Sequence, residues 1–271
     1  MIPQSLGQLL SDTVARLPDK KAFLFKTAGV YDSITWADFL KKTEATASFF
    51  INLGLKKGDR IAILSENRPE WAMTDLAAQT IGVITIPIYT SLTANEISYL
   101  LKDSETCLLA VSGKELFEKI PPIQRSLPSL KHLLAFDSTL SLSREEVSIP
   151  IHLMKEAEKT QRFSGLDGLR DSCGGETIAS IIYTSGTTGT PKGVMLTHSN
   201  FIHNAIGSRE TLKMSENDIH LSFLPLSHVF ERMAGYYLMM MIGATIAYAE
   251  TMETVPKNLL EVRPTFILGV P

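Results

Sequence analysis

The sequence contains little cysteine, no large excess of either charge and no long apolar run. Its 271 residues include two cysteines, Cys107 and Cys173, which are far apart and form no C-x-x-C pair. We therefore expect a reduced, cytoplasmic protein that needs no disulfide or metal to stabilise its fold. Its 26 Lys and Arg residues are nearly balanced by 29 Asp and Glu residues and form no basic block, which argues against a nucleic-acid partner.

The sequence does not favour a membrane-spanning helix, which needs about 20 predominantly apolar residues. The most apolar window, residues 233–249, is interrupted by Gly235 and Gly243 and bounded by charged residues. We predict a buried helix followed by a buried strand there, and a peripheral membrane contact is the alternative. The first residues lack the basic and apolar regions of a signal peptide, so we expect no export.

Short apolar segments alternate with amphipathic segments along the first part of the chain. We expect strands over residues 60–64, 83–87 and 106–111, and helices over residues 6–17, 35–54 and 69–82. Another helix is expected to begin at Thr93, which can form a capping box with Glu96. Parallel strands need crossover connections and are covered by helices on both faces. The pattern therefore predicts an α/β protein with mostly parallel sheets flanked by helices.

The polar stretch of residues 138–175 divides this pattern. It loses a clear period apart from a short strand at residues 149–153 and a charged helix near residues 155–162. The apolar pattern then resumes. We therefore predict two α/β subdomains: residues 1–175, of which 138–175 form an irregular connection, and residues 176–271.

Glycines and hydroxyls are concentrated in the loop that follows the strand expected at residues 177–183. The loop reads Tyr183-Thr-Ser-Gly-Thr-Thr-Gly-Thr-Pro-Lys-Gly193. Glycines let backbone N–H groups turn toward an anion, hydroxyls add donors, and Lys192 adds a positive charge. The loop therefore predicts a polyphosphate-binding site after a strand.

The spacing of this loop differs from that of the P-loop of NTPases, G-x-x-x-x-G-K-[ST]. Pro191 and Gly193 stand where that motif needs Gly and Ser or Thr, which excludes a standard P-loop enzyme. A flexible turn that merely joins two strands is the other interpretation of a short Gly/Thr run.

Several segments together resemble the adenylate-forming superfamily of acyl-CoA synthetases, luciferases and peptide-synthetase adenylation domains. The loop followed by Val194-Met-Leu-Thr-His198 is similar to the phosphate-binding signature of that superfamily. Residues 59–67 with Trp71, and residues 82–89, resemble segments near the start of that family's sequences. The segments Leu224-Pro-Leu-Ser-His-Val-Phe-Glu-Arg232 and Arg263-Pro-Thr265 resemble the long-chain fatty-acid branch. The resemblance implies the N-terminal part of the large domain of such an enzyme.

The resemblance implies a two-step ligation. A fatty carboxylate attacks the α-phosphate of ATP to give an acyl-adenylate and pyrophosphate, and coenzyme A then displaces AMP. Oriented N–H groups, hydroxyls, a lysine and Mg²⁺ would stabilise the charge that develops on the phosphoryl oxygens. The implied catalytic residues are Thr184 near the metal, Lys192 at the β/γ-phosphates and His228 near the substrate carboxylate. The implied nucleotide-binding residues are Thr184, Ser185, Gly186, Thr187, Thr188, Gly189 and Lys192.

Each of these roles has a structural alternative. The hydroxyl of Thr184 could bond only to backbone, as is common for threonine. His228 could satisfy a backbone group at a helix start. His198 and His203 are five residues apart, off the i, i+4 spacing of paired ligands on a helix, so zinc is not expected. The tyrosines and methionines of residues 236–241 could line a lipid channel, but such residues are more often core.

The family pattern also includes parts that this sequence does not contain. They are an adenine-stacking segment that ends in a metal-binding glutamate, a ribose-binding aspartate, a hinge, and a C-terminal domain with a catalytic lysine. We therefore expect an incomplete second sheet and weak or no activity from this chain alone. The alternative functions are an acyl-AMP ligase or another adenylating relative that passes its acyl group to a carrier protein, and a non-catalytic fragment that binds fatty acid or a partner.

Overall fold

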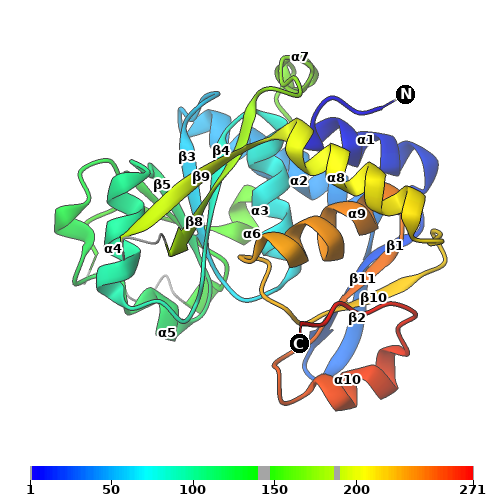
Figure 1. Ribbon diagram of the computed structural model, residues 1–271. Helices are drawn as coiled ribbons and strands as arrows, with labels where there is room; N and C mark the ends of the chain where they lie inside the picture. The colour runs from blue at the N-terminus through cyan, green and yellow to red at the C-terminus, as the bar shows by residue number, and fades with distance from the viewer. Residues whose placement is uncertain (1, 140–146, 186–189, 271) are drawn as a thin grey trace.

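Two β-sheets organise the computed structural model, which describes residues 2–139, 147–185 and 190–270 (Figure 1). The larger sheet contains β3 (Arg60–Leu64), β4 (Ile84–Ile88), β5 (Leu108–Val111), β6 (His132–Ala135), β7 (Ile151–Leu153), β8 (Ile178–Ser185) and β9 (Pro191–Thr197). The smaller sheet contains β1 (Lys21–Thr27), β2 (Val30–Thr35), β10 (Ile219–Ser222) and β11 (Thr245–Tyr248). Their strand orders are β7-β6-β5-β3-β4-β8-β9 and β10-β11-β1-β2.

Both sheets are parallel except at one edge. In the larger sheet only β9 runs antiparallel to its neighbour β8, and in the smaller sheet only β2 runs antiparallel to β1. The longer helices are α1 (Leu6–Arg16), α2 (Trp36–Asn52), α3 (Pro69–Thr80), α4 (Ala94–Asp103), α8 (His198–Thr211) and α10 (Val255–Val262). The shorter ones are α5 (Lys114–Phe117), η1 (Gln124–Ser126), α6 (Met154–Ala157), α7 (Leu166–Asp171), the π-helix η3 (Glu231–Tyr237) and α9 (Leu238–Ile242). The α/β class with mostly parallel, helix-flanked sheets is confirmed.

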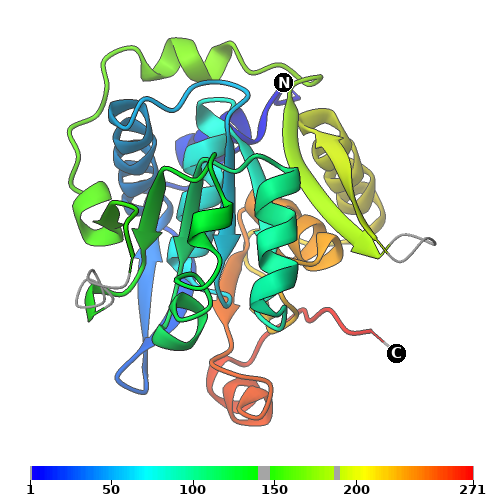
Figure 2. The same cartoon turned by 90° about the vertical axis from the view of Figure 1, so that its left-hand side faces the viewer.

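The larger sheet separates two apolar cores. Successive residues of β3 point to opposite faces, so Ile61 and Ile63 join one core while Ala62 and Leu64 join the other. Figures 1 and 2 show α4 and α5 on one face and α2 and α3 on the other. The core on the second face also contains residues of β1 and β11, so the two sheets share it. A central strand that is covered on both faces explains the continuous apolar run at residues 60–64.

Local signals set several helix boundaries as expected. Thr93 accepts from the backbone N–H of Glu96, whose carboxylate accepts from the backbone N–H of Thr93, which completes the predicted capping box of α4. Helix α2 starts after Thr35, whose hydroxyl accepts from the N–H of Asp38 at 3.1 Å. Helix α3 begins at Pro69.

The boundary predicted between residues 175 and 176 is not where the two sheets divide. Strand β8 pairs with β4 and so extends the larger sheet, whereas β1 and β2 from the N-terminal part belong to the smaller sheet. The β1–β2 hairpin and β6 were not predicted. The apolar run of β1 lies between Lys21 and Lys26 and does not alternate in burial, and its turn depends on positive φ angles of 51° at Ala28 and 82° at Gly29.

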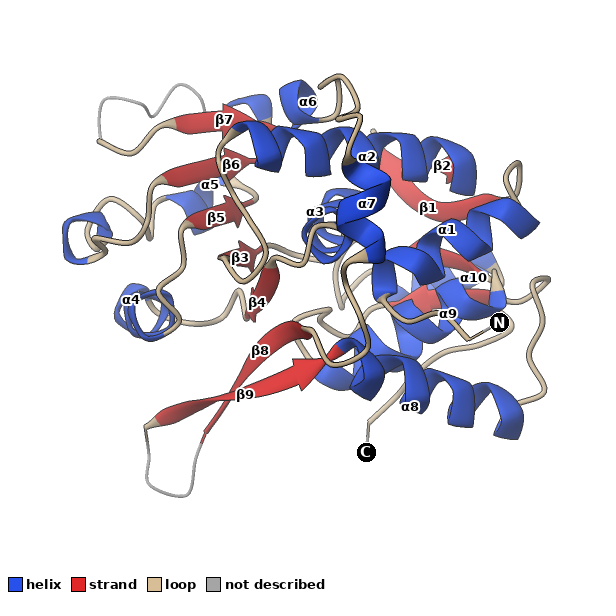
Figure 3. Cartoon of the chain, turned by 90° about the horizontal axis from the view of Figure 1, so that it is seen from above, coloured by secondary structure: helices blue, strands red, loops and turns tan. Residues whose placement is uncertain are grey.

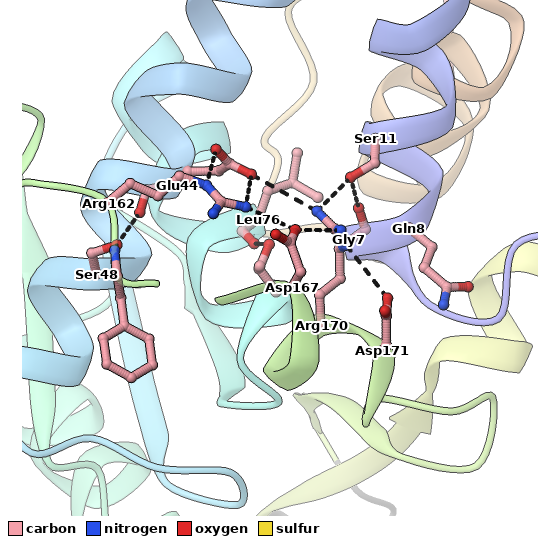
Figure 4. A network of polar contacts seen from close by, with 12 residues as sticks. Gly7, Gln8, Ser11, Glu44, Ser48, Leu76, Arg162, Asp167, Arg170 and Asp171 are labelled. Carbon is pink, nitrogen blue, oxygen red and sulfur yellow. Dashed lines mark hydrogen bonds and ion pairs between the residues drawn. The ribbon is translucent and has the colours of Figure 1, made fainter. Parts of the chain in front are cut away.

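Ion pairs hold the connection before β8 against the helices. The guanidinium of Arg162 bonds to Glu44 of α2 at 2.7 Å and to Asp167 of α7 at 2.7 Å. Arg170 bonds to Asp167 at 2.6 Å and donates to the hydroxyl of Ser11 in α1 at 3.1 Å (Figure 4). The connection is therefore fixed to α1 and α2 by specific contacts although its sequence has no clear period.

The apolar window at residues 233–249 forms the end of η3, helix α9 and strand β11, and nearly all of it is buried. This confirms the predicted helix and strand. Within the described residues, no helix has both the length and the hydrophobicity needed to cross a bilayer. At the edge of the smaller sheet, His220 of β10 forms a single parallel β-bridge with Phe266, which lies outside the named strands.

Candidate active site

The β8–β9 hairpin carries the expected phosphate-binding residues. Thr184 and Lys192 are direct partners in its register, so their side chains share one face of the hairpin, and both are exposed. Figure 3 shows the hairpin extending away from the rest of the larger sheet. Ser185 ends β8, and the expected ligands Gly186, Thr187, Thr188 and Gly189 lie outside the described residues.

Contacts with α4 and β4 hold this hairpin in place. The hydroxyl of Tyr183 donates to Asp103 at 2.6 Å, and that of Tyr99 donates to the carbonyl of Pro191 at 3.0 Å. Burial and the hydrogen bond to Asp103 raise the pKa of Tyr183, so its hydroxyl stays protonated and remains a donor. The hydroxyl of Ser180 donates to the carbonyl of Thr85 at 2.6 Å.

Gly193 has a packing role in the hairpin. It pairs with Tyr183, and a Cβ at this position would lie 2.6 Å from Cγ2 of Ile181 and 3.4 Å from Cζ of Tyr183. Glycine therefore lets these two side chains lie across β9. Packing against Ile181 and Tyr183 is therefore enough to explain a glycine at position 193, whether or not a ligand binds there.

His228 lies in the turn that leads from β10 to η3. Its Nδ1 accepts from the N–H of Phe230 at 3.1 Å, and its ring lies 6.5 Å from that of Tyr89 in a T-shaped arrangement. The backbone contact that sequence analysis gave as the alternative role is therefore present. Because Nδ1 is the acceptor, the neutral ring carries its proton on Nε2. The imidazole is exposed, and Val229 and Phe230 beside it are also exposed.

A cavity of about 200 Å³ lies where the carboxyl ends of strands from both sheets meet. Its lining includes Ser227, the residue before His228. Such crevices are the usual ligand sites of open α/β sheets. Its lining residues follow β3, β4 and β11 or lie at and after the end of β10; they are Ser65, Glu66, Asn67, Thr90, Ser222, Phe223, Pro225, Ser227, Ala249, Glu250, Thr251 and Met252. Neither Asn67, three residues after the end of β3, nor Ser222, the last residue of β10, was assigned a role from the sequence.

A buried polar network joins β8 of the hairpin to η3. The fully buried guanidinium of Arg232 pairs with Asp75 of α3 and donates to the hydroxyl of Ser180 in β8 at 2.7 Å. The hydroxyl of Tyr237 donates to Asp75 at 2.5 Å. Burial alone, the largest single effect, would lower the pKa of Arg232, but the charge of Asp75 and the contributions of Tyr237 and Tyr236 together raise that pKa. Tyr237 and its neighbour Tyr236 are thus core residues.

His198 and His203 occupy different environments on α8. His198 is fully buried and accepts from the N–H of Leu6 through Nδ1 at 3.2 Å, whereas His203 is exposed. Among the described residues, no group of three or more His, Cys, Asp or Glu side chains is arranged to hold a metal ion.

The chain matches the family model of the AMP-binding enzymes over residues 10–271. It is 34% identical over 251 residues to fatty acyl-CoA synthetase A of Dictyostelium discoideum, covering 90% of this chain and 36% of that protein. It is 30% identical over 276 residues to the long-chain-fatty-acid–CoA ligase ACSBG2 of Xenopus laevis, covering 99% of this chain and 37% of that protein. The chain thus spans little more than a third of the length of these relatives.

Solved structures share the fold. The N-terminal domain of FACL13 from Mycobacterium tuberculosis superimposes with a TM-score of 0.80 at 25% identity, over 99% of this chain and 63% of that one. The anthranilate CoA ligase AuaEII does so with a TM-score of 0.83 at 19% identity, over 98% of this chain and 50% of that one. The chain belongs to the AMP-binding enzyme family, and it corresponds to the N-terminal portion of long-chain fatty acyl-CoA synthetase relatives.

Proposed function

We propose that this chain supplies the triphosphate-binding and carboxylate-binding parts of a long-chain fatty acid–CoA ligase. The carboxylate oxygen of a fatty acid attacks the α-phosphorus of ATP, the bond to the β-phosphate oxygen breaks, and pyrophosphate leaves. The thiol of coenzyme A then attacks the acyl carbon of the adenylate, and AMP leaves. The observation that carries the proposal is the cross-strand pairing of Thr184 with Lys192 beside a segment rich in glycine and threonine.

On the triphosphate side, Lys192 offsets the charge of the β- and γ-phosphates. Its exposure on the same hairpin face as Thr184 supports this role, because both groups can reach one anion. Ser185, Gly186, Thr187, Thr188 and Gly189 are proposed to supply N–H and hydroxyl donors to the same phosphates. Fixed donors of this kind stabilise the charge of the leaving pyrophosphate without reorganisation.

Mg²⁺ fits this region as an ion carried by the nucleotide. The described residues offer the hydroxyl of Thr184 and no cluster of carboxylates, and Mg²⁺ is commonly held by substrate phosphates, waters and few protein ligands. Thr184 would be the ligand from this chain. When bound, the ion would neutralise phosphate charge during the first step.

On the carboxylate side, His228 donates from Nε2 to the fatty carboxylate. The bond from Phe230 to Nδ1 supports this role, because it fixes the tautomer and the ring orientation. The exposed side chains of Val229 and Phe230 offer apolar surface to the start of the acyl chain. A carboxylate held by a neutral donor keeps its charge and remains a nucleophile.

Binding of inorganic tripolyphosphate to the chain, measured by calorimetry, tests the triphosphate side. We expect Lys192→Ala to weaken binding by about tenfold, the effect of one charge-assisted contact. Lys213→Ala is the matched control, because it removes the same charge from an exposed position after α8. Equal affinities of the two variants would refute the role of Lys192.

A full-length protein containing this segment tests the reaction itself. With ATP, palmitate and coenzyme A, a ligase forms the thioester. Accumulation of acyl-adenylate without thioester would favour an acyl-AMP ligase, and fatty-acid binding without any ATP-dependent product would favour a binding protein.

A further inference from the structure

The short segment of residues 222–228 connects β10 to the turn that carries His228. We refer to it as the connecting segment. It lines the cavity between the sheets, and its own backbone bond runs from the N–H of His228 to the carbonyl of Pro225 at 2.9 Å. Its position relative to the larger sheet therefore depends on contacts with residues from elsewhere in the chain.

Asn67, which follows β3 of the larger sheet, makes three such contacts. Its Nδ2 donates to the carbonyl of Leu224 at 2.7 Å and to the hydroxyl of Ser222 at 3.0 Å. Its Oδ1 accepts from the N–H of Leu226 at 2.8 Å. One side chain thus bonds to both sides of Pro225 and joins the two sheets at the cavity.

The chemistry of this contact requires an amide. The two hydrogens of Nδ2 are both engaged with the connecting segment, and Oδ1 takes a third bond from it. Asn67 therefore has no donor left for a ligand, although it lines the cavity. An aspartate here would set an oxygen against the carbonyl of Leu224, so a side chain of the same shape cannot replace it.

A second contact holds the far side of His228. The N–H of Arg232 donates to the carbonyl of His228 at 3.0 Å, and the side chain of Arg232 is fixed by Asp75 in the buried network. His228 thus lies between two attachments, one on each side in sequence. Loss of Asn67 would release the first and leave the second intact.

We propose that Asn67 is a positioning residue that holds the connecting segment and thereby sets the place of His228, which follows the cavity-lining residue Ser227. This inference rests on the proposed role of His228 toward a fatty carboxylate. A small displacement of a positioned side chain removes much of its contribution to binding. Release of the connecting segment therefore weakens carboxylate binding and leaves phosphate binding at the β8–β9 hairpin unaltered.

Hydrogen–deuterium exchange of the chain tests the contact directly. We expect Asn67→Ala to speed exchange in peptides of residues 222–230 by about tenfold, because the segment opens more often once its bonds to Asn67 are lost. Asn67→Asp keeps the volume and the acceptor for Leu226, and it serves as the second variant if the alanine variant unfolds. Thr35→Ala, which removes the N-cap bond of α2, is the control for general destabilisation. It should leave the exchange rates of these peptides unaltered.

Ligand binding tests the positioning role. Titration of a fluorescent fatty acid should show about tenfold weaker binding to the Asn67 variants, while the affinity for tripolyphosphate changes by less than about twofold. A merely structural role would weaken both ligands together. Unaltered exchange at residues 222–230 in both variants overturns the contact, and faster exchange with unaltered fatty-acid affinity overturns the positioning of His228.

A His228→Ala variant separates this inference from the proposed function. If His228→Ala binds fatty acid as well as the unaltered chain, or if the unaltered chain binds none, the proposed role of His228 fails. The exchange rates of the Asn67 variants still decide whether Asn67 holds the connecting segment.

Discussion

The buried imidazole of His198 makes the stability of the protein depend on pH. His198 starts α8, and its Nδ1 accepts from the N–H of Leu6 at 3.2 Å, so a protonated ring would set two donors against each other. Its Nε2 is buried and has no hydrogen-bond partner among the described residues. Burial, and secondarily the charges of Lys57 and Arg232, lower the pKa of His198 to about 4 from an ordinary value of 6.5. The folded protein therefore keeps this ring neutral.

The sign and size of the effect follow from proton linkage. Between about pH 6.5 and pH 4 the unfolded chain binds a proton at His198 and the folded chain does not, so acid favours unfolding. At one pKa unit per about 1.4 kcal/mol, the loss relative to pH 7 is about 2 kcal/mol at pH 5 and about 3 kcal/mol near pH 4. The destabilisation is thus small above about pH 7, grows as the pH falls from about 6.5 to about 4, and levels off below the folded pKa.

Urea denaturation of matched variants at pH 7 and pH 5 measures this contribution. Asn in place of His198 keeps an acceptor for Leu6 but cannot be protonated, so His198→Asn should lose about 2 kcal/mol less than the unaltered protein between the two pH values. His203→Asn makes the same substitution at an exposed position of the same helix and should keep the original loss. An equal loss in the unaltered protein and in His198→Asn would refute the reasoning.

Two further predictions concern stability measured by urea denaturation at pH 7. Thr93→Ala removes the capping box of α4 and should lower the free energy of unfolding by about 1 kcal/mol, and an unaltered value would show that the box is not formed in solution. Asp75→Asn leaves the buried guanidinium of Arg232 without its counter-charge and should cost about 3–5 kcal/mol. Tyr236→Phe, which removes one buried hydroxyl bonded to Ala72, should cost only about 1 kcal/mol, so equal losses would contradict the importance of the ion pair.

Local sequence signals predicted those parts of the fold that local interactions determine. The capping box at Thr93, the proline that starts α3 and the apolar run of β3 each depend on residues within one turn or one strand. The assignment of β8 to the larger sheet depends instead on long-range contacts. Gln79 donates to the carbonyl of Ala179 at 2.9 Å, and Ser180 donates to that of Thr85, partners about 100 residues apart. No periodicity encodes such a choice, so the sheet to which β8 belongs could not be predicted from the local pattern.

The candidate site shows the same division. The phosphate-binding role of the loop before Lys192 was predicted from its composition alone, because many donors and glycines are close in sequence. Asn67 carried no such signal, since its three partners are 155 to 159 residues away. The contact of His228 with Phe230 is local, and it fixes the tautomer, which residue type alone does not determine.

The two sides of the candidate site are attached to the same buried network. Ser180, five residues before the end of β8, accepts from the guanidinium of Arg232, and the N–H of Arg232 donates to the carbonyl of His228. The distance between the β8–β9 hairpin and His228 therefore depends on the strands and helices packed around Asp75, and not only on the loops that carry the candidate site residues. Sites supported in this way hold their geometry more closely than sites held by loops alone, and the proposed reaction of a carboxylate with a phosphate would need that distance to be constant.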